Sequence, residues 1–243
     1  MNLKKSINLL QKKPEAKFDP YPHFIIYDAL PDDIYQELYE TKPTPEQIIN
    51  GRQTTENQRV DIPTRKALDI ATPLWREFIL ENSSGPFVAN LLSIFGYRML
   101  AWSSLCGIRG TGNYDISTEC QPGLNTPLTK TQSVRGPHLD NPIELYGGMF
   151  YMPDPNDLSF GGELEIYRLI ESPRFYGKLE IDSSCCELMD VVPYKANTLV
   201  MFLNGPKSVH GVSPRTPTTT YRQLVNLIGE VQKPLFKVGH GRY

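Results

Sequence analysis

The sequence predicts a mainly β protein with helices at its N-terminal end, folded as a double-sheet jelly roll or a related barrel. Two observations predict this class. Residues 1–96 carry helix-start signals followed by apolar residues at helical spacing. From about Tyr97 to residue 232, short apolar or alternating runs are separated by Gly, Pro, Asn and Asp, with no helical period of useful length. Many short strands with turn signals are typical of jelly rolls and barrels.

Four helix-start signals occur before residue 97. Pro31 is followed by two aspartates, which suit the positive end of a helix dipole, and Thr44-Pro45-Glu46-Gln47 has the form of a capping box. Thr72-Pro73 and Ser84-Gly85-Pro86 open two further segments, and Gly96 ends the last one. We expect these helices to pack on the outside of one sheet, because their apolar faces need a partner.

Five runs in the second part of the chain have the character of strands. They are Tyr97–Ser103, Met149–Met152, Leu164–Tyr167, Thr198–Leu203 and Leu224–Ile228. The polar stretch Thr111–Lys130 and much of Glu171–Ser184 are expected to be long loops, which in a compact domain are usually functional or disordered. No boundary separates the parts, so we expect one domain over residues 1–243, with 1–96 as helical support, 97–232 as the β core and 233–243 as a tail.

Composition excludes several classes of protein. A chain of 243 residues with 40% hydrophobic and 21% charged residues can bury a core without disulfides, and its net charge of -2 gives no general attraction to nucleic acid or anionic membrane. The four cysteines form no CxxC pair, so we expect reduced thiols. No apolar run approaches the roughly 20 residues that span a bilayer, and the N-terminus lacks a signal-peptide core. We therefore expect a cytoplasmic protein without nucleic-acid or membrane partners.

The pair His138 and Asp140 has the spacing of metal ligands on a strand. Residues two apart on an extended strand point to the same side, about 6–7 Å apart, so both side chains can converge on one cation. One imidazole and one carboxylate, completed by a distant second imidazole such as His210, form the facial triad of non-haem iron(II) oxygenases. By itself the pair is equally compatible with a surface turn after Gly136-Pro137.

Arg222 opens an apolar strand twelve positions after His210. An arginine on the inner face of a strand is costly to bury unless it meets an anion, and its planar fork matches a carboxylate. A dicarboxylic cosubstrate would supply that anion, with its other end on the metal. Arg215 lies five positions after His210 and is a rival, but it follows Pro214 in a turn-like region.

In their order, these motifs resemble the prolyl-hydroxylase-like branch of the 2-oxoglutarate- and iron(II)-dependent dioxygenases. The matching segments are His138–Pro142, Met149–Met152, Gly161–Tyr167 and Ser208–Val212, with a lead-in at Tyr21–Pro31. The resemblance implies a double-stranded β-helix, the cupin-like form of the jelly roll. It implies that His138, Asp140 and His210 hold iron(II) as the catalytic centre and that Arg222 binds 2-oxoglutarate. In relatives the basic residue usually lies nine or ten positions after the second histidine, so the spacing here is longer.

Tyr151 falls where relatives often carry a tyrosine that hydrogen-bonds the cosubstrate; an aromatic core residue is the other interpretation. The implied chemistry is oxidative decarboxylation of 2-oxoglutarate by O2, coupled to hydroxylation. A peptidyl, prolyl or amino-acid-like substrate is favoured, and a small metabolite or a sugar- or lipid-linked molecule is the alternative. A cupin-like metal-binding module without oxygenase activity is the competing class. We expect Thr111–Lys130 or Glu171–Ser184 to cover the iron and contact the substrate.

Overall fold

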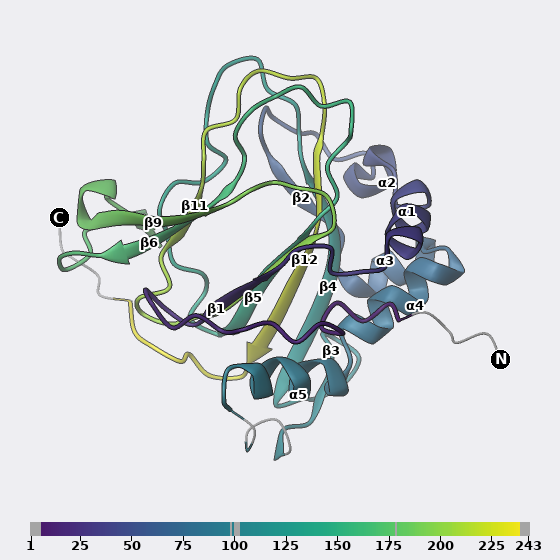
Figure 1. The fold of residues 1–243 in the computed structure, drawn as a ribbon, viewed down its shortest axis with the longest axis horizontal. Helices are drawn as coiled ribbons and strands as arrows, with labels where there is room; N and C mark the ends of the chain where they lie inside the picture. Colours follow the sequence, from purple (N-terminus) through teal and green to yellow (C-terminus); the bar gives the residue numbers. More distant parts are fainter. Residues whose placement is uncertain (1–5, 98, 100–102, 178, 239–243) are drawn as a thin grey trace.

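Two mainly antiparallel sheets of unequal size form the centre of the computed structural model, which describes residues 6–97, 99, 103–177 and 179–238 (Figure 1). The large sheet contains β1 His23–Ile26, β2 Arg59–Asp61, β3 Cys106–Ile108, β4 Ile116–Asn125, β5 Glu144–Tyr151, β10 Thr198–Leu203 and β12 Arg222–Val231. Its order is β1-β10-β5-β12-β4-β2, and β3 runs parallel to β4. The small sheet has the order β11-β6-β9 and contains β6 Leu164–Leu169, β9 Cys186–Val192 and β11 His210–Val212. The prediction of a mainly β protein is confirmed.

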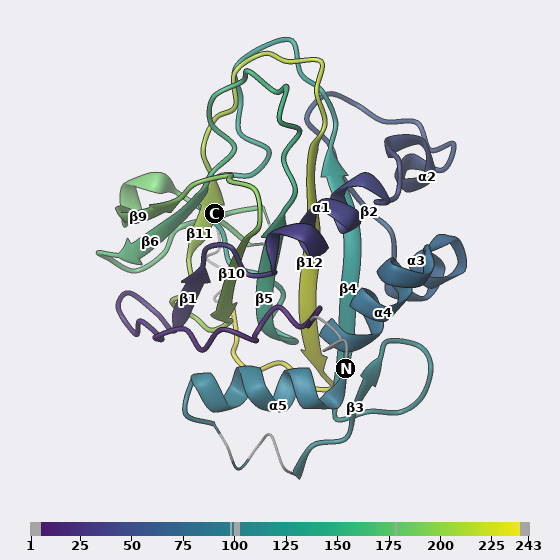
Figure 2. The same ribbon diagram turned by 45° about the vertical axis from the view of Figure 1, so that its right-hand side comes forward.

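Within the described residues, five helices with defined bounds lie beside the large sheet, away from the small one (Figure 2). They are α1 Asp32–Glu40, α2 Pro45–Ile49, α3 Thr64–Ile70, α4 Pro73–Asn82 and α5 Gly85–Ile94. The capping box at Thr44 is present, and the hydroxyls of Thr72 and Ser84 cap α4 and α5, so these helices begin where the sequence predicts. None of the helices that the structure describes has the length and apolar character needed to cross a membrane.

The large sheet separates two cores by simple strand alternation. On β5, Tyr146 and Phe150 pack with the helices, and the Phe150 ring lies 5.9 Å from the Phe78 ring of α4. The residues that alternate with them, Met149 and Tyr151, face the small sheet instead. The face of the large sheet turned towards the small sheet is therefore the one available to a site.

Four of the five expected strands are present, and three of these are longer than predicted. The fifth, Tyr97–Ser103, lies partly outside the described residues, and its described members Met99 and Ser103 have helical rather than extended backbone.

The prediction of a long loop over Thr111–Lys130 is wrong. Residues Ile116–Asn125 form β4, which pairs with β12 over its full length and with β2 at its end. Pro122 does not interrupt the pairing with β12. Its carbonyl accepts from Ile62, just beyond the end of β2, and in an antiparallel strand the missing N–H would point to that same side. Its buried polar side chains have specific places: Thr118 donates to the carbonyl of Ser83, Glu119 accepts from Thr64, and Asn125 lines a cavity.

The segment Glu171–Ser184 is partly structured. It contains a hairpin of β7 Phe175–Tyr176 and β8 Glu180–Ile181, followed by the 3-10 helix η1 Ser183–Cys185. The hairpin lies beside the segment that carries His138, because Glu180 forms a β-bridge with His138 and Ile181 donates to the carbonyl of Pro137. It therefore extends the small sheet rather than crossing the solvent as a loop.

Candidate metal centre

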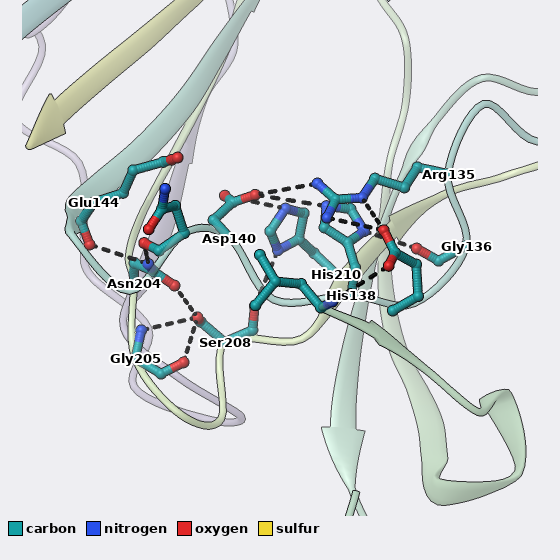
Figure 3. Close-up of polar contacts among 12 residues, drawn as sticks. Arg135, Gly136, His138, Asp140, Glu144, Asn204, Gly205, Ser208 and His210 are labelled. Carbon is teal, nitrogen blue, oxygen red and sulfur yellow. Dashed lines mark hydrogen bonds and ion pairs between the residues drawn. The ribbon is translucent and has the colours of Figure 1, made fainter. Parts of the chain in front are cut away.

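His138 and Asp140, two positions apart in the sequence, meet the distant His210 at the edge of the small sheet (Figure 3). His138 and His210 form a β-bridge, and their ring centroids are 4.2 Å apart. Asp140 Oδ1 lies 3.6 Å from His138 Nε2, and Asp140 Oδ2 lies 3.4 Å from His210 Nε2. One ligand atom from each residue lies within 4.8 Å of the other two. The structure thus brings together the three residues that the sequence nominated.

The donor set fits a divalent transition metal. Two ligands at right angles, each about 2.1 Å from a metal, are about 3 Å apart, which is close to the separations here. Two imidazoles and one carboxylate on one side of a metal suit non-haem iron(II) and leave further positions open.

Both histidines are held by the same local contact. His138 Nδ1 lies 2.7 Å from the carbonyl oxygen of Gly136, and His210 Nδ1 lies 2.9 Å from that of Ser208. A carbonyl only accepts, so each neutral ring carries its proton on Nδ1 and presents an unprotonated Nε2 to the metal. Ser208 is itself fixed by Asn204, whose amide donates to the carbonyl of Glu144.

Electrostatics prepare these groups for metal binding. Burial opposes ionisation of Asp140, but the nearby His210, His138 and Arg135 outweigh it and hold the carboxyl pKa below its usual range. Burial lowers the pKa of His210 to about 4 despite the opposing effect of Asp140. A deprotonated carboxylate and a neutral imidazole are the forms that bind a metal.

Arg135 connects the centre to the β7–β8 hairpin. Its guanidinium lies 3.2 Å from Glu180 and 3.7 Å from Asp140 Oδ1 (Figure 3). The hairpin therefore reaches the metal centre through an ion pair as well as through the backbone bridge at His138.

The metal centre lies in a cavity of about 590 Å³ between the sheets. Its polar lining includes Thr55, Glu56, Asn57, Gln58, Arg59, Asp61, Asn125, Arg135, Glu144, Asn226 and Arg222, and its apolar lining includes Val134, Met149, Leu164, Phe202, Val212 and Ile228. A volume of this size is typical of a small-molecule site.

Arg222 is buried in this cavity without a carboxylate partner among the described residues. It is 2% exposed; Nε donates to the carbonyl of Gly162 at 2.8 Å, and Nη1 donates to Asn125 Oδ1 at 3.3 Å. Both Nη2 of Arg222 and Nδ2 of Asn125 are buried with no hydrogen-bond partner. Burial lowers the pKa of Arg222, because the buried charge lacks an anion. Two unused donors beside a buried cation make a cradle for a carboxylate.

Arg215 has a different environment. Its guanidinium lies 2.6 Å from Asp157 and donates to Ser159 and to the carbonyl of Thr220, and the residue is 1% exposed. It does not line the cavity. Its charge is already balanced within the loops, so the geometry favours Arg222 over Arg215 as an anion site.

Tyr151 lies beside Arg222, whose guanidinium carbon is 5.3 Å from the Tyr151 ring centroid and 4.6 Å from that of Tyr194. The Tyr151 hydroxyl makes a weak contact with Met149 Sδ, at 4.0 Å, and burial raises the pKa of Tyr151 although the charge of Arg222 opposes this. Tyr151 is fully buried and packs in the core between the sheets. Both the cosubstrate role and the core role remain compatible with this position.

Sequence reasoning missed four parts of this site: Asn125, Arg135, Glu144 and the segment Thr55–Arg59. Arg135 and Glu144 each lie within four positions of the metal pair, and that proximity is the signal that could have nominated them. Asn125 and Thr55–Arg59 carry no such signal, since only sheet pairing brings them to Arg222.

Burial, followed by repulsion from Asp140 and Glu230, raises the pKa of Glu144 to about 8, as expected for a carboxyl without a counter-charge.

No protein-family model and no curated protein sequence matches this chain. Solved structures do resemble it. A prolyl 4-hydroxylase from Phytophthora capsici is 16% identical with a TM-score of 0.48; the alignment covers 94% of this chain and 62% of that one, so this chain spans less than two thirds of its length. A Pseudomonas putida prolyl-4-hydroxylase is 14% identical, with a TM-score of 0.46 and coverage of 95% and 98%. The non-heme alpha ketoglutarate dependent carbocyclase SnoK from nogalamycin biosynthesis is 12% identical, with a TM-score of 0.49 and coverage of 95% and 85%.

Proposed function

We propose that this chain is an iron(II)- and 2-oxoglutarate-dependent oxygenase that hydroxylates its substrate. One observation carries the proposal: a two-histidine, one-carboxylate centre shares a cavity with Arg222, a buried cation that lacks an anion. A metal-binding module without this chemistry has no use for such an arginine, because an unpaired buried charge only destabilises the fold.

The chain's own residues prepare the metal for the reaction. His138, Asp140 and His210 would hold iron(II) on one side and leave the cavity side open. When bound, iron(II) with 2-oxoglutarate supplies O2 activation, which decarboxylates the cosubstrate to succinate and CO2 and oxidises a C–H bond. The carbonyls of Gly136 and Ser208 keep both imidazoles in the orientation that metal binding requires.

Arg222 and Asn125 would hold the distal carboxylate of 2-oxoglutarate. The charge of Arg222 supplies affinity, and the two free donors, Arg222 Nη2 and Asn125 Nδ2, supply direction. Gly162 leaves room for this arrangement, because a Cβ there would lie 3.2 Å from the Arg222 side chain. Tyr151 would line the same end of the site.

The strand arrangement supports a double-stranded β-helix of the jelly-roll type within one oxygenase domain. Strands β4, β12, β5 and β10 would form one of its sheets. The segment at His138, which bridges β11, would join β11, β6 and β9 to form the other. The substrate is a peptidyl or amino-acid-like molecule in this proposal.

Anaerobic titration tests the proposal directly. Purified protein loaded with one equivalent of iron(II) should develop a weak visible charge-transfer band when 2-oxoglutarate is added, because the cosubstrate chelates the metal. Succinate formation in air should require both iron(II) and 2-oxoglutarate. A protein that binds iron but gives neither the band nor succinate would be a metal-binding module of another kind.

A further inference from the structure

Charged side chains lie at both ends of the cavity along the large sheet. Arg59 and Arg222 both lie opposite Asn125 in the strand register, so two cations flank one end. Eight residues further along β12, Glu230 lies opposite Glu144 of β5. Arg59 is paired with Asp61, and Glu230, which is not part of the cavity lining, is paired with Arg109. Arg222 at one end of the cavity, where 2-oxoglutarate is proposed to bind, and Glu144 at the other are therefore left without an ion pair.

Among the described charged residues that line the cavity, Glu144 is the one whose charged group makes neither a hydrogen bond nor an ion pair. Its carboxyl makes no hydrogen bond or ion pair, whereas Asp61 is paired with Arg59 at 2.7 Å and Glu56 accepts from Thr129 at 2.8 Å. The nearby cations are already engaged. Arg109 lies 2.6 Å from Glu230 and 3.4 Å from Glu119, while Arg135 is paired with Glu180 and Asp140.

The negative charge of ionised Glu144 has no counter-charge even when iron(II) and 2-oxoglutarate are bound. Iron(II) and Arg222 contribute three positive charges, and Asp140 and the 2-oxoglutarate dianion contribute three negative ones. The reacting centre is thus neutral, and ionised Glu144 beside it has no counter-charge. Glu144 is half-buried, and a carboxylate partly removed from water without a counter-charge is unfavourable, so a cationic ligand would stabilise it.

The space between Glu144 and the metal centre suits an aliphatic chain. Gly147 lies between them on β5, and a Cβ there would be 3.3 Å from Asp140 Oδ2 and 2.8 Å from the Phe202 ring. Because Gly147 has no side chain, β5 leaves space in front of the metal triad. Ile228 of β12 lies opposite Gly147, and Met149 follows two residues later on β5. Figure 3 shows the Glu144 side chain extending on the same side as the Asp140 carboxylate.

We propose that Glu144 binds a primary ammonium or guanidinium group at the end of an aliphatic chain of the substrate. The chain's C–H bonds would then lie over Gly147, at the triad. This inference rests on the proposed function and narrows its substrate to the cationic members of the amino-acid-like class. A free basic amino acid and a lysine or arginine side chain in a peptide present the same group, and the test separates them.

Equilibrium binding tests the inference without turnover. Anaerobic protein loaded with iron(II) and 2-oxoglutarate is titrated with L-lysine and Nα-acetyl-L-lysine methylamide, each compared with its norleucine counterpart, and with L-arginine compared with L-citrulline. At least one cationic probe should bind about tenfold to 100-fold more tightly than its neutral counterpart, the range expected of a charge-assisted contact. A preference confined to the free amino acids indicates a small-molecule substrate, and one shared by the blocked form indicates a peptide.

Two variants locate the cation. Glu144→Gln should reduce the ratio of cationic to neutral affinity to about one. Glu187→Gln, which removes an exposed carboxylate of β9 outside the cavity, should leave the ratio as in the native protein. Equal binding of charged and neutral probes by the native protein overturns the inference, and so does a preference that survives Glu144→Gln. Failure of the proposed function is distinguishable, because the native protein would then show no 2-oxoglutarate band before any probe is added.

Discussion

Arg222 donates to the side-chain oxygen of Asn125 at 3.3 Å, and each residue keeps a buried nitrogen without a partner. The two residues are neighbours across β12 and β4 although they are almost a hundred positions apart in the chain. The contact holds two neighbouring residues that line the cavity, and each has one donor free for the proposed anion. The proposed cosubstrate site therefore depends on a pair of residues rather than on the arginine alone.

Removal of any metal ligand should abolish metal binding and turnover. His138→Ala, Asp140→Ala and His210→Ala each leave two ligands, and loss of Asp140 also removes the charge that balances the metal. Iron content after anaerobic loading, measured together with succinate formation, checks this. Circular dichroism should show a retained fold, since the large sheet and helices lie outside the centre. Full iron occupancy in any of the three variants would show that the triad is wrongly assigned.

Arg222→Ala should weaken 2-oxoglutarate binding about tenfold to 100-fold, because a charge-assisted hydrogen bond contributes about 1.5–3 kcal/mol. Titration of the charge-transfer band gives the affinity. Arg215→Ala should change this affinity little. It should instead lower the free energy of unfolding by about 3–5 kcal/mol, because it leaves Asp157 buried without its partner. Exchange of these two outcomes would identify Arg215 as the anchor.

Asn125→Asp should weaken 2-oxoglutarate binding more than Asn125→Ala does. The alanine removes one donor and the oxygen that orients Arg222, whereas the aspartate also supplies a carboxylate that pairs with Arg222, as Asp157 pairs with Arg215. The cosubstrate would then compete with a built-in anion. Affinities of the two variants, measured by the same titration, should differ by several-fold in this order. The opposite order would mean that Arg222 is not the cosubstrate anchor.

The β7–β8 hairpin should be needed for coupled turnover but not for metal binding. Replacing residues 173–182 with a short glycine-containing turn removes Glu180 and its contacts with Arg135 and His138, while the three ligands and Arg222 remain. Iron and 2-oxoglutarate should still bind, and slow uncoupled decarboxylation should continue. Product formation on the true substrate should fall sharply, as expected when a segment that shields the centre is lost. Unchanged coupling would place substrate recognition elsewhere, with Thr55–Arg59 as the next candidate.

The local elements of this protein are determined by short stretches of its sequence. The caps at Thr44, Thr72 and Ser84 fix helix starts through contacts between residues three positions apart. The run Thr198–Leu203 is short, apolar and followed by the turn residues Asn204-Gly205-Pro206, a pattern that favours a buried strand. The spacing of His138 and Asp140 likewise follows from two positions on one segment. Such features are predictable because the interactions that produce them lie within one turn or one strand.

Tertiary structure decided the rest. Ile116–Asn125 has the composition of a loop, and it is a strand because β12 and β2 supply hydrogen bonds on both sides. Its buried polar side chains Thr118 and Glu119 find partners in Ser83 and Thr64. Asn125 reaches Arg222, and Glu144 reaches the metal centre, through sheet register, which no local pattern encodes. A one-residue shift in register would turn each of these side chains to the other face of the sheet. The sequence alone therefore nominates the metal ligands, while the residues around them become visible only when the strands are paired.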